Sequence, residues 1–173
     1  MVVTSKTVVI NIVWFFVLIF FQVLILNHIN LGGFINPYFY VFFILLLPFE
    51  TPKWLLLISS FFLGLGIDLF TYTPGLNASA SVLTAFLRPF VITVISSGQE
   101  SFTEESPTLR GQGLKWFLYY SVSLVVIHHT SLFFLEIFRF DEIFFTLFRA
   151  VLSSLFTLLL IFITEYLLFS GKK

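Results

Sequence analysis

Residues 8–26, VVINIVWFFVLIFFQVLIL, decide the fold class of this chain, because only Asn11 and Gln22 interrupt the apolar run. A helix needs roughly 20 mainly apolar residues to cross a hydrocarbon core about 30 Å thick. The run therefore predicts a membrane-spanning helix. It is longer than the apolar core of a signal peptide and lacks a small-x-small cleavage site, so we expect it to be retained.

The composition extends this conclusion to the whole chain. Its residues are 58% hydrophobic and 10% charged, whereas soluble domains are about 25% charged. The 26 Phe residues lie in continuous apolar runs, without the alternation of a membrane β-barrel. We expect an all-α polytopic membrane protein, with residues 1–173 forming one integral membrane domain. A net charge of zero argues against a nucleic-acid partner, and the absence of cysteine excludes disulfides and thiolate metal ligands.

Six helices fit within this length. The weakest prediction is the second, because Pro37 and Pro48 bracket only a short apolar stretch, which suits a thin span and a re-entrant segment equally well. Residues 96–113 are polar and glycine-containing, which predicts a water-exposed loop. The predicted helices cover residues 8–26, 37–50, 54–70, 77–95, 114–135 and 143–168.

The distribution of cations predicts the orientation. With six spans, a single loop cation, Arg139, falls on one side of the membrane. Cytoplasmic loops carry the excess of Lys and Arg, so we expect both termini in the cytoplasm. Five spans would place the termini on opposite sides. The cations on the predicted cytoplasmic side are Lys6, Lys53, Arg110, Lys115, Lys172 and Lys173.

Ser60, Gly64 and Asp68 recur every four residues in the third predicted helix. This spacing places them on one face, and small residues allow close contact between helices. The face is a candidate surface for a partner helix. Asp68 has two open interpretations: it binds a cation or substrate, or it reaches the membrane interface and ties down the following turn.

Arg88 and Arg149 are charged residues within predicted spans, where charge is costly unless it snorkels, pairs or faces water. Both lie near enough to a helix end to snorkel. Arg149 also shares a face with Ser153 and Thr157 at spacings of four, which fits a stripe facing the bundle. In that alternative Asp68 is a possible ion-pair partner for Arg149.

No motif predicts an enzyme or a cofactor site. His128 and His129 are adjacent, so their side chains point about 100° apart on a helix, and the HExxH spacing of zinc enzymes is missing. There is also no serine nucleophile elbow and no phosphate-binding glycine loop. We therefore expect no catalysis, no metal and no cofactor.

Several stretches resemble one family of membrane proteins. Residues 62–70, FLGLGIDLF, are followed by PGLNA at 74–78 and FLRP at 86–89, while QVLILNHI stands at 22–29 and LLLP at 45–48. Together they closely resemble the rod shape-determining protein MreD family, particularly its Bacteroidetes-type forms. The resemblance covers roughly residues 22–95. Asn77 stands where many relatives have histidine after the glycine.

The resemblance implies a non-catalytic inner-membrane subunit of the bacterial cell-elongation (rod) complex, or elongasome, that maintains cell shape during peptidoglycan synthesis. The implied partners are an MreC-like protein, the actin-like MreB, a SEDS glycosyltransferase and a class B penicillin-binding protein, besides membrane lipid. Partner contacts would use the small-residue and polar faces that contain Ser60, Gly64, Asp68, Arg88 and Arg149.

The family is also said to be similar in structure to the six-helix substrate-binding (S) components of energy-coupling-factor transporters. That similarity raises a rival function, a substrate-binding component of a small-solute (vitamin) transporter. Such components dock through an Ala-x-x-x-Ala face on their first helix. Residues 8–26 contain no alanine, which favours the scaffold.

Overall fold

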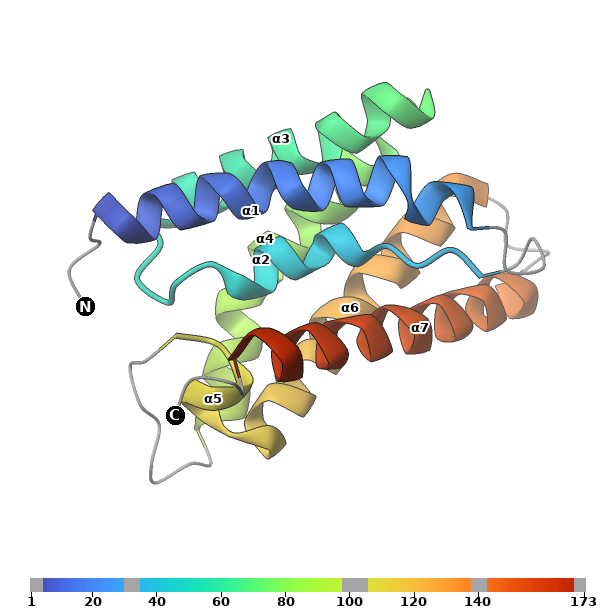
Figure 1. Ribbon diagram of the computed structural model, residues 1–173. Helices are drawn as coiled ribbons and strands as arrows, with labels where there is room; N and C mark the ends of the chain where they lie inside the picture. Colours follow the sequence, from blue (N-terminus) through green and yellow to red (C-terminus); the bar gives the residue numbers. More distant parts are fainter. Residues whose placement is uncertain (1–4, 30–34, 98–105, 138–142, 170–173) are drawn as a thin grey trace.

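The computed structural model describes residues 5–29, 35–97, 106–137 and 143–169, which fold into a helical bundle (Figure 1). The start of α1 (Ser5–Leu24) and the end of α7 (Ile143–Phe169) lie at the same end of the bundle. We call this the near end and the opposite end the far end. The remaining long helices are α3 (Lys53–Thr71), α4 (Leu76–Ser96) and α6 (Leu114–Ile137).

Five helices of the described chain are long and apolar enough to cross a membrane. Their outward surfaces carry large apolar side chains, such as Phe16 on α1 and Phe90 on α4, which are 52% and 68% exposed. Exposed aromatic surface on this scale needs lipid around it. The chain is therefore a multi-pass helical membrane protein, as its composition predicts.

The long helices pack mainly in chain order, α3 on α4, α4 on α6 and α6 on α7, with α1 against α3. The α3–α4 hairpin turns at the far end, where Tyr72 and Gly75 both have positive φ angles of 56° and 79°. The αL conformation at Tyr72 ends α3. Gly75 adopts the same region without a steric penalty and begins α4.

The predicted second helix is shorter and less regular than expected. In place of a helix over residues 37–50, a 3-10 turn η2 (Phe39–Val41) leads into α2 (Phe42–Leu46), and residues 36–38 have no helical structure. This part of the chain runs beside α1 (Figure 1). Its residues from Phe39 to Leu45 are almost fully buried. The segment is thus a core element rather than a lipid-facing helix.

The other boundaries agree with the sequence to within a few residues. A 3-10 turn η1 (Leu26–His28) follows α1, and a short helix α5 (Leu109–Gln112) lies in the predicted loop over 96–113. The Thr108 hydroxyl caps α5 by accepting from the Gly111 N–H at 3.2 Å. The cation Arg139, the acidic residue Asp141 that would cap the predicted helix over 143–168, and residues 98–105 of that loop lie outside the described residues.

Candidate functional site

Asp68 joins α3 to the start of α4. Its Oδ1 accepts from the Asn77 backbone N–H at 3.1 Å and from the Asn77 side-chain amide at 2.9 Å, and its Oδ2 accepts from the Ala78 N–H at 2.9 Å. The Thr73 hydroxyl donates a further short hydrogen bond. The N-cap residue of α4, Gly75, has no side chain that could accept these hydrogen bonds. The carboxylate of Asp68, which belongs to α3, therefore caps the start of α4. Of the two interpretations of Asp68, its contacts fit the structural one.

Gly64 is the point of closest approach between α3 and α4. A Cβ atom placed on Gly64 would lie 2.5 Å from the Cα of Ala78, closer than any real side chain tolerates. Ser60, one turn earlier, is fully buried, and its hydroxyl has no hydrogen-bond partner among the described residues. The predicted small-residue face therefore exists, and it packs against α4 of the same chain.

A buried polar centre connects this junction to η2 and α6. The Tyr40 hydroxyl donates to Asn77 Oδ1 at 2.9 Å and lies 2.9 Å from His128 Nε2. Because the single Tyr40 proton goes to Asn77, the His128 Nε2 must carry the proton and donate to Tyr40. The Asn77 side-chain amide in turn donates a hydrogen bond to Asp68 Oδ1. Four elements are thus tied together by one continuous set of hydrogen bonds.

The non-helical backbone before η2 is satisfied by polar side chains of α1 and α7. The Asn36 N–H donates to Ser153 Oγ and the Tyr38 N–H donates to Thr157 Oγ1, each at 3.1 Å. From α1, the Gln22 amide nitrogen donates to the Pro37 carbonyl at 2.9 Å. Irregular backbone at membrane depth is tolerated only where it is buried in protein, and these contacts provide that condition. They also confirm that Ser153 and Thr157 face the bundle.

Arg88 is buried in α4, only 2% exposed, and does not snorkel. Its Nε donates to the Tyr120 hydroxyl at 2.7 Å, and its Nη2 makes a short hydrogen bond to the Leu47 carbonyl. Tyr120 in turn donates to the Leu45 carbonyl at 3.0 Å. The carbonyls at the end of a helix have no partner within it, so Arg88 and Tyr120 together satisfy the end of α2.

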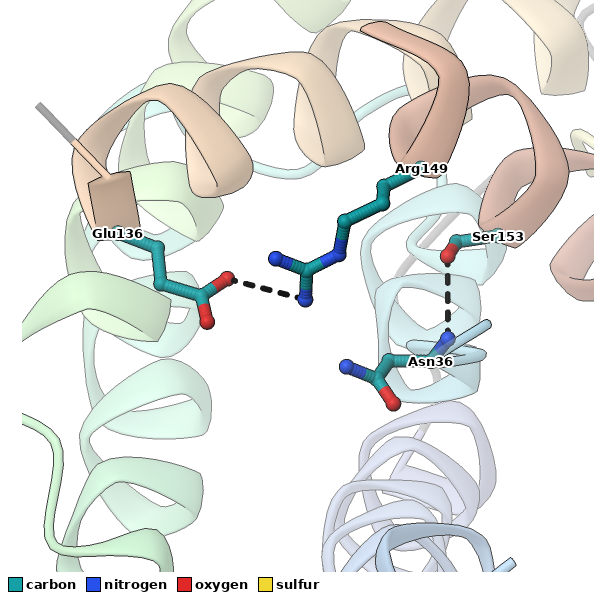
Figure 2. Close-up of polar contacts among 4 residues, drawn as sticks. All are labelled: Asn36, Glu136, Arg149 and Ser153. Atoms are coloured by element: carbon teal, nitrogen blue, oxygen red, sulfur yellow. Dashed lines mark hydrogen bonds and ion pairs between the residues drawn. The ribbon is translucent and has the colours of Figure 1, made fainter. Parts of the chain in front are cut away.

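Arg149 pairs with Glu136 at the far end, not with Asp68. Figure 2 shows the guanidinium of Arg149 reaching from α7 towards the Glu136 carboxylate on α6, and the two groups are 3.7 Å apart. The Arg149 guanidinium also lies 4.7 Å from the centre of the Phe133 ring. Side-chain exposures of 13% for Arg149 and 40% for Glu136 place the pair at the bundle surface. Asn36 and Ser153 meet beside it (Figure 2).

The pair of histidines serves two different contacts. His128 belongs to the polar centre, whereas His129 Nε2 lies 3.0 Å from Thr157 Oγ1 and its Nδ1 lies 3.0 Å from the Val125 carbonyl. Within the described ranges, no three His, Cys, Asp or Glu side chains gather as metal ligands. Each imidazole contacts polar groups of neighbouring residues inside the bundle.

Sequence reasoning missed several residues of this network. Tyr40 and Tyr120 look like ordinary aromatic residues of apolar runs, and nothing in the spacing marks their hydroxyls as internal partners. Glu165 is fully buried near the end of α7, where its Oε2 accepts from the Leu109 N–H of α5 at 3.0 Å. A carboxylate in an apolar run is a signal that could have singled out Glu165.

Comparisons with known proteins add no identification: no family model, no curated protein and no solved structure matches the chain.

Proposed function

We propose that this chain is a non-catalytic inner-membrane subunit of the bacterial cell-elongation complex, an MreD-type scaffold that holds an MreC-like protein beside MreB, a SEDS glycosyltransferase and a class B penicillin-binding protein. The observation that carries the proposal is the sequence resemblance over residues 22–95. Its motif residues Gly64 and Asp68 meet Asn77, which stands where many relatives have histidine, at the α3–α4 junction. They would give the scaffold its shape rather than touch a substrate.

The arrangement of polar groups supports a scaffold. Asp68, Asn77, Tyr40 and His128 bond to one another inside the bundle, which fixes the relative positions of the helices. A preorganised surface binds partners with a smaller entropic cost. The small-residue face of α3 is occupied by α4, so we place the partner contact elsewhere than the sequence suggested.

The partner surface that we propose is the outer face of α1. Of the five candidate spans, α1 buries the smallest share of its residues within the bundle. Val13, Phe16 and Phe20 on this face are each at least half exposed. In lipid, helices associate by close packing rather than by the hydrophobic effect, and these side chains offer a contoured surface to a partner helix.

The proposed topology has six crossings, the number in the S components of energy-coupling-factor transporters, and both termini in the cytoplasm. It is supported by the position of the start of α1 and the end of α7 at one end of the bundle. The segment that contains η2 and α2 runs beside α1 and would be the sixth crossing. The positive-inside distribution of Lys53, Arg110 and Lys115 supports a cytoplasmic near end.

Affinity purification in mild detergent tests the function. A tagged chain should retain an MreC-like protein, and Phe16→Ala should weaken that association, whereas Phe90→Ala on the outer face of α4 is the matched control and should not. Depletion of the chain should convert rods to spheres. Normal rod shape in a clean deletion would refute the proposal, and tight binding of a vitamin would favour the transporter component.

A further inference from the structure

A pocket opens at the near end of the bundle, on the opposite side of the polar centre from the α3–α4 turn. It has a volume of about 370 Å³ and lies between the start of α3 and the second half of α4. Its charged lining residues are Glu50, Lys53 and Arg88, and its apolar lining includes Leu56, Pro89 and Ile92. Pockets of several hundred Å³ are large enough to bind small molecules.

The guanidinium of Arg88 lines this pocket without a carboxylate partner among the described residues. Two of its nitrogens donate to neutral oxygens, the Tyr120 hydroxyl and the Leu47 carbonyl. No described carboxylate forms an ion pair with it, and Nη1 has no hydrogen-bond partner within the described chain. A buried guanidinium without a counter-charge is costly. An anion in the pocket would supply that charge.

The start of α3 adds donors to the same pocket. Pro52, the N-cap residue of α3, makes no side-chain capping bond, so backbone N–H groups of the first turn lack the usual acceptor. Helix N-termini attract anions through these groups and the helix dipole. Lys53 stands in that turn and lines the pocket. With the Glu50 carboxylate counted against Lys53 and Arg88, the lining still has a net charge of +1.

We propose that the near-end pocket binds the phosphate of an anionic phospholipid. Arg88 and Lys53 would contact the phosphate oxygens, while Leu56, Pro89 and Ile92 would contact the glycerol and the first acyl carbons. The apolar wall and the position at an end of the membrane-spanning bundle favour a lipid over free phosphate as the source of that group. This inference does not depend on the proposed cellular function.

Native mass spectrometry of the full-length protein in detergent tests the proposal. Phosphatidylglycerol and phosphatidylcholine are added in equal amounts, and the bound fraction of each is measured. We expect phosphatidylglycerol to be preferred. Lys53→Gln should lower its apparent affinity about fivefold, the effect of one cation at an anionic lipid surface. Lys115 is an exposed cation at the start of α6 and does not line the pocket. Lys115→Gln should therefore leave the affinity unchanged.

A second variant separates the lipid from a free anion. Ile92→Trp fills the apolar part of the pocket and keeps both cations, so it should reduce phosphatidylglycerol binding as well. Inorganic phosphate at millimolar concentration should not displace the lipid. Equal binding of the two lipids, equal effects of Lys53→Gln and Lys115→Gln, or displacement by inorganic phosphate would each overturn the proposal. Arg88 is not substituted in this test, because it also holds Leu47 and Tyr120.

Discussion

The carboxylate of Asp68 and the amide of Asn77 lie 2.9 Å apart, and the same carboxylate oxygen also accepts from the Asn77 backbone N–H. One side chain near the end of α3 therefore determines where α4 begins. Removing it with Asp68→Ala leaves buried N–H donors of Asn77 and Ala78 without an acceptor. We expect the free energy of unfolding, measured by SDS titration, to fall by about 2–4 kcal/mol.

The control for Asp68 is Ser79→Ala, because the exposed Ser79 hydroxyl bonds only to the Gly75 carbonyl of the same turn. It should change the unfolding free energy by less than about 0.5 kcal/mol. Unchanged stability of Asp68→Ala together with lost cellular function would instead favour the ligand-binding interpretation of Asp68.

Gly64→Ala should disrupt the α3–α4 contact. Its new methyl group would meet the backbone of Ala78 at 2.5 Å, where neither helix can yield without moving apart. Overpacking of this kind costs about 1–3 kcal/mol or more. Gly66→Ala is the matched control, because its Cβ would meet only the flexible Ile19 side chain, whose terminal carbon would lie 3.0 Å away. Equal melting temperatures for the two variants would contradict the close approach at Gly64.

Thr157→Val should loosen the non-helical segment before η2. The substitution keeps the shape of the side chain but removes the acceptor for the Tyr38 N–H and the partner of His129. We expect a loss of about 1–2 kcal/mol and faster hydrogen exchange at Tyr38. Thr164→Val on the same helix serves as the comparison, since the Thr164 hydroxyl bonds only to the Leu160 carbonyl of its own helix. Slow exchange at Tyr38 in both variants would count against this role of Thr157.

Loss of the Arg88 contacts should destabilise the protein more than loss of the ion pair between Arg149 and Glu136. Arg88→Gln removes the bonds to the Leu47 carbonyl and the Tyr120 hydroxyl and should lower the free energy of unfolding by about 2–4 kcal/mol. Arg88→Lys should not restore this stability, because an ammonium group cannot make both of the hydrogen bonds that the planar guanidinium makes. Glu136→Gln removes a partly exposed ion pair and should cost less than about 1 kcal/mol. Thermal unfolding of the three purified variants tests this order.

The positions of the long helices could be predicted from the sequence, because each apolar run has the length that a bilayer requires. That Asp68 ties down the turn after α3 was one of its two interpretations, but its partners Asn77 and Ala78 could not be predicted, since these contacts depend on α4 turning back over α3. The sequence left Asp68 open as an ion-pair partner of Arg149. Arg149 instead pairs with Glu136, whose proximity follows only from the packing of α6 on α7. The non-helical backbone at residues 36–38 could not be predicted either, because its hydrogen-bond partners Ser153 and Thr157 lie more than a hundred residues later in the chain.

That separation has a consequence for biosynthesis. Asn36 and Ser153 are 117 residues apart, so the stretch before η2 emerges from the ribosome long before α7 exists to accept its N–H groups. An unsatisfied peptide backbone is not stable in hydrocarbon. We therefore expect the segment to remain at the membrane interface or within the insertion machinery, and to enter the bundle last, after α7 has been inserted. Truncation before α7 should leave this stretch open to protease, even though the earlier spans are already inserted.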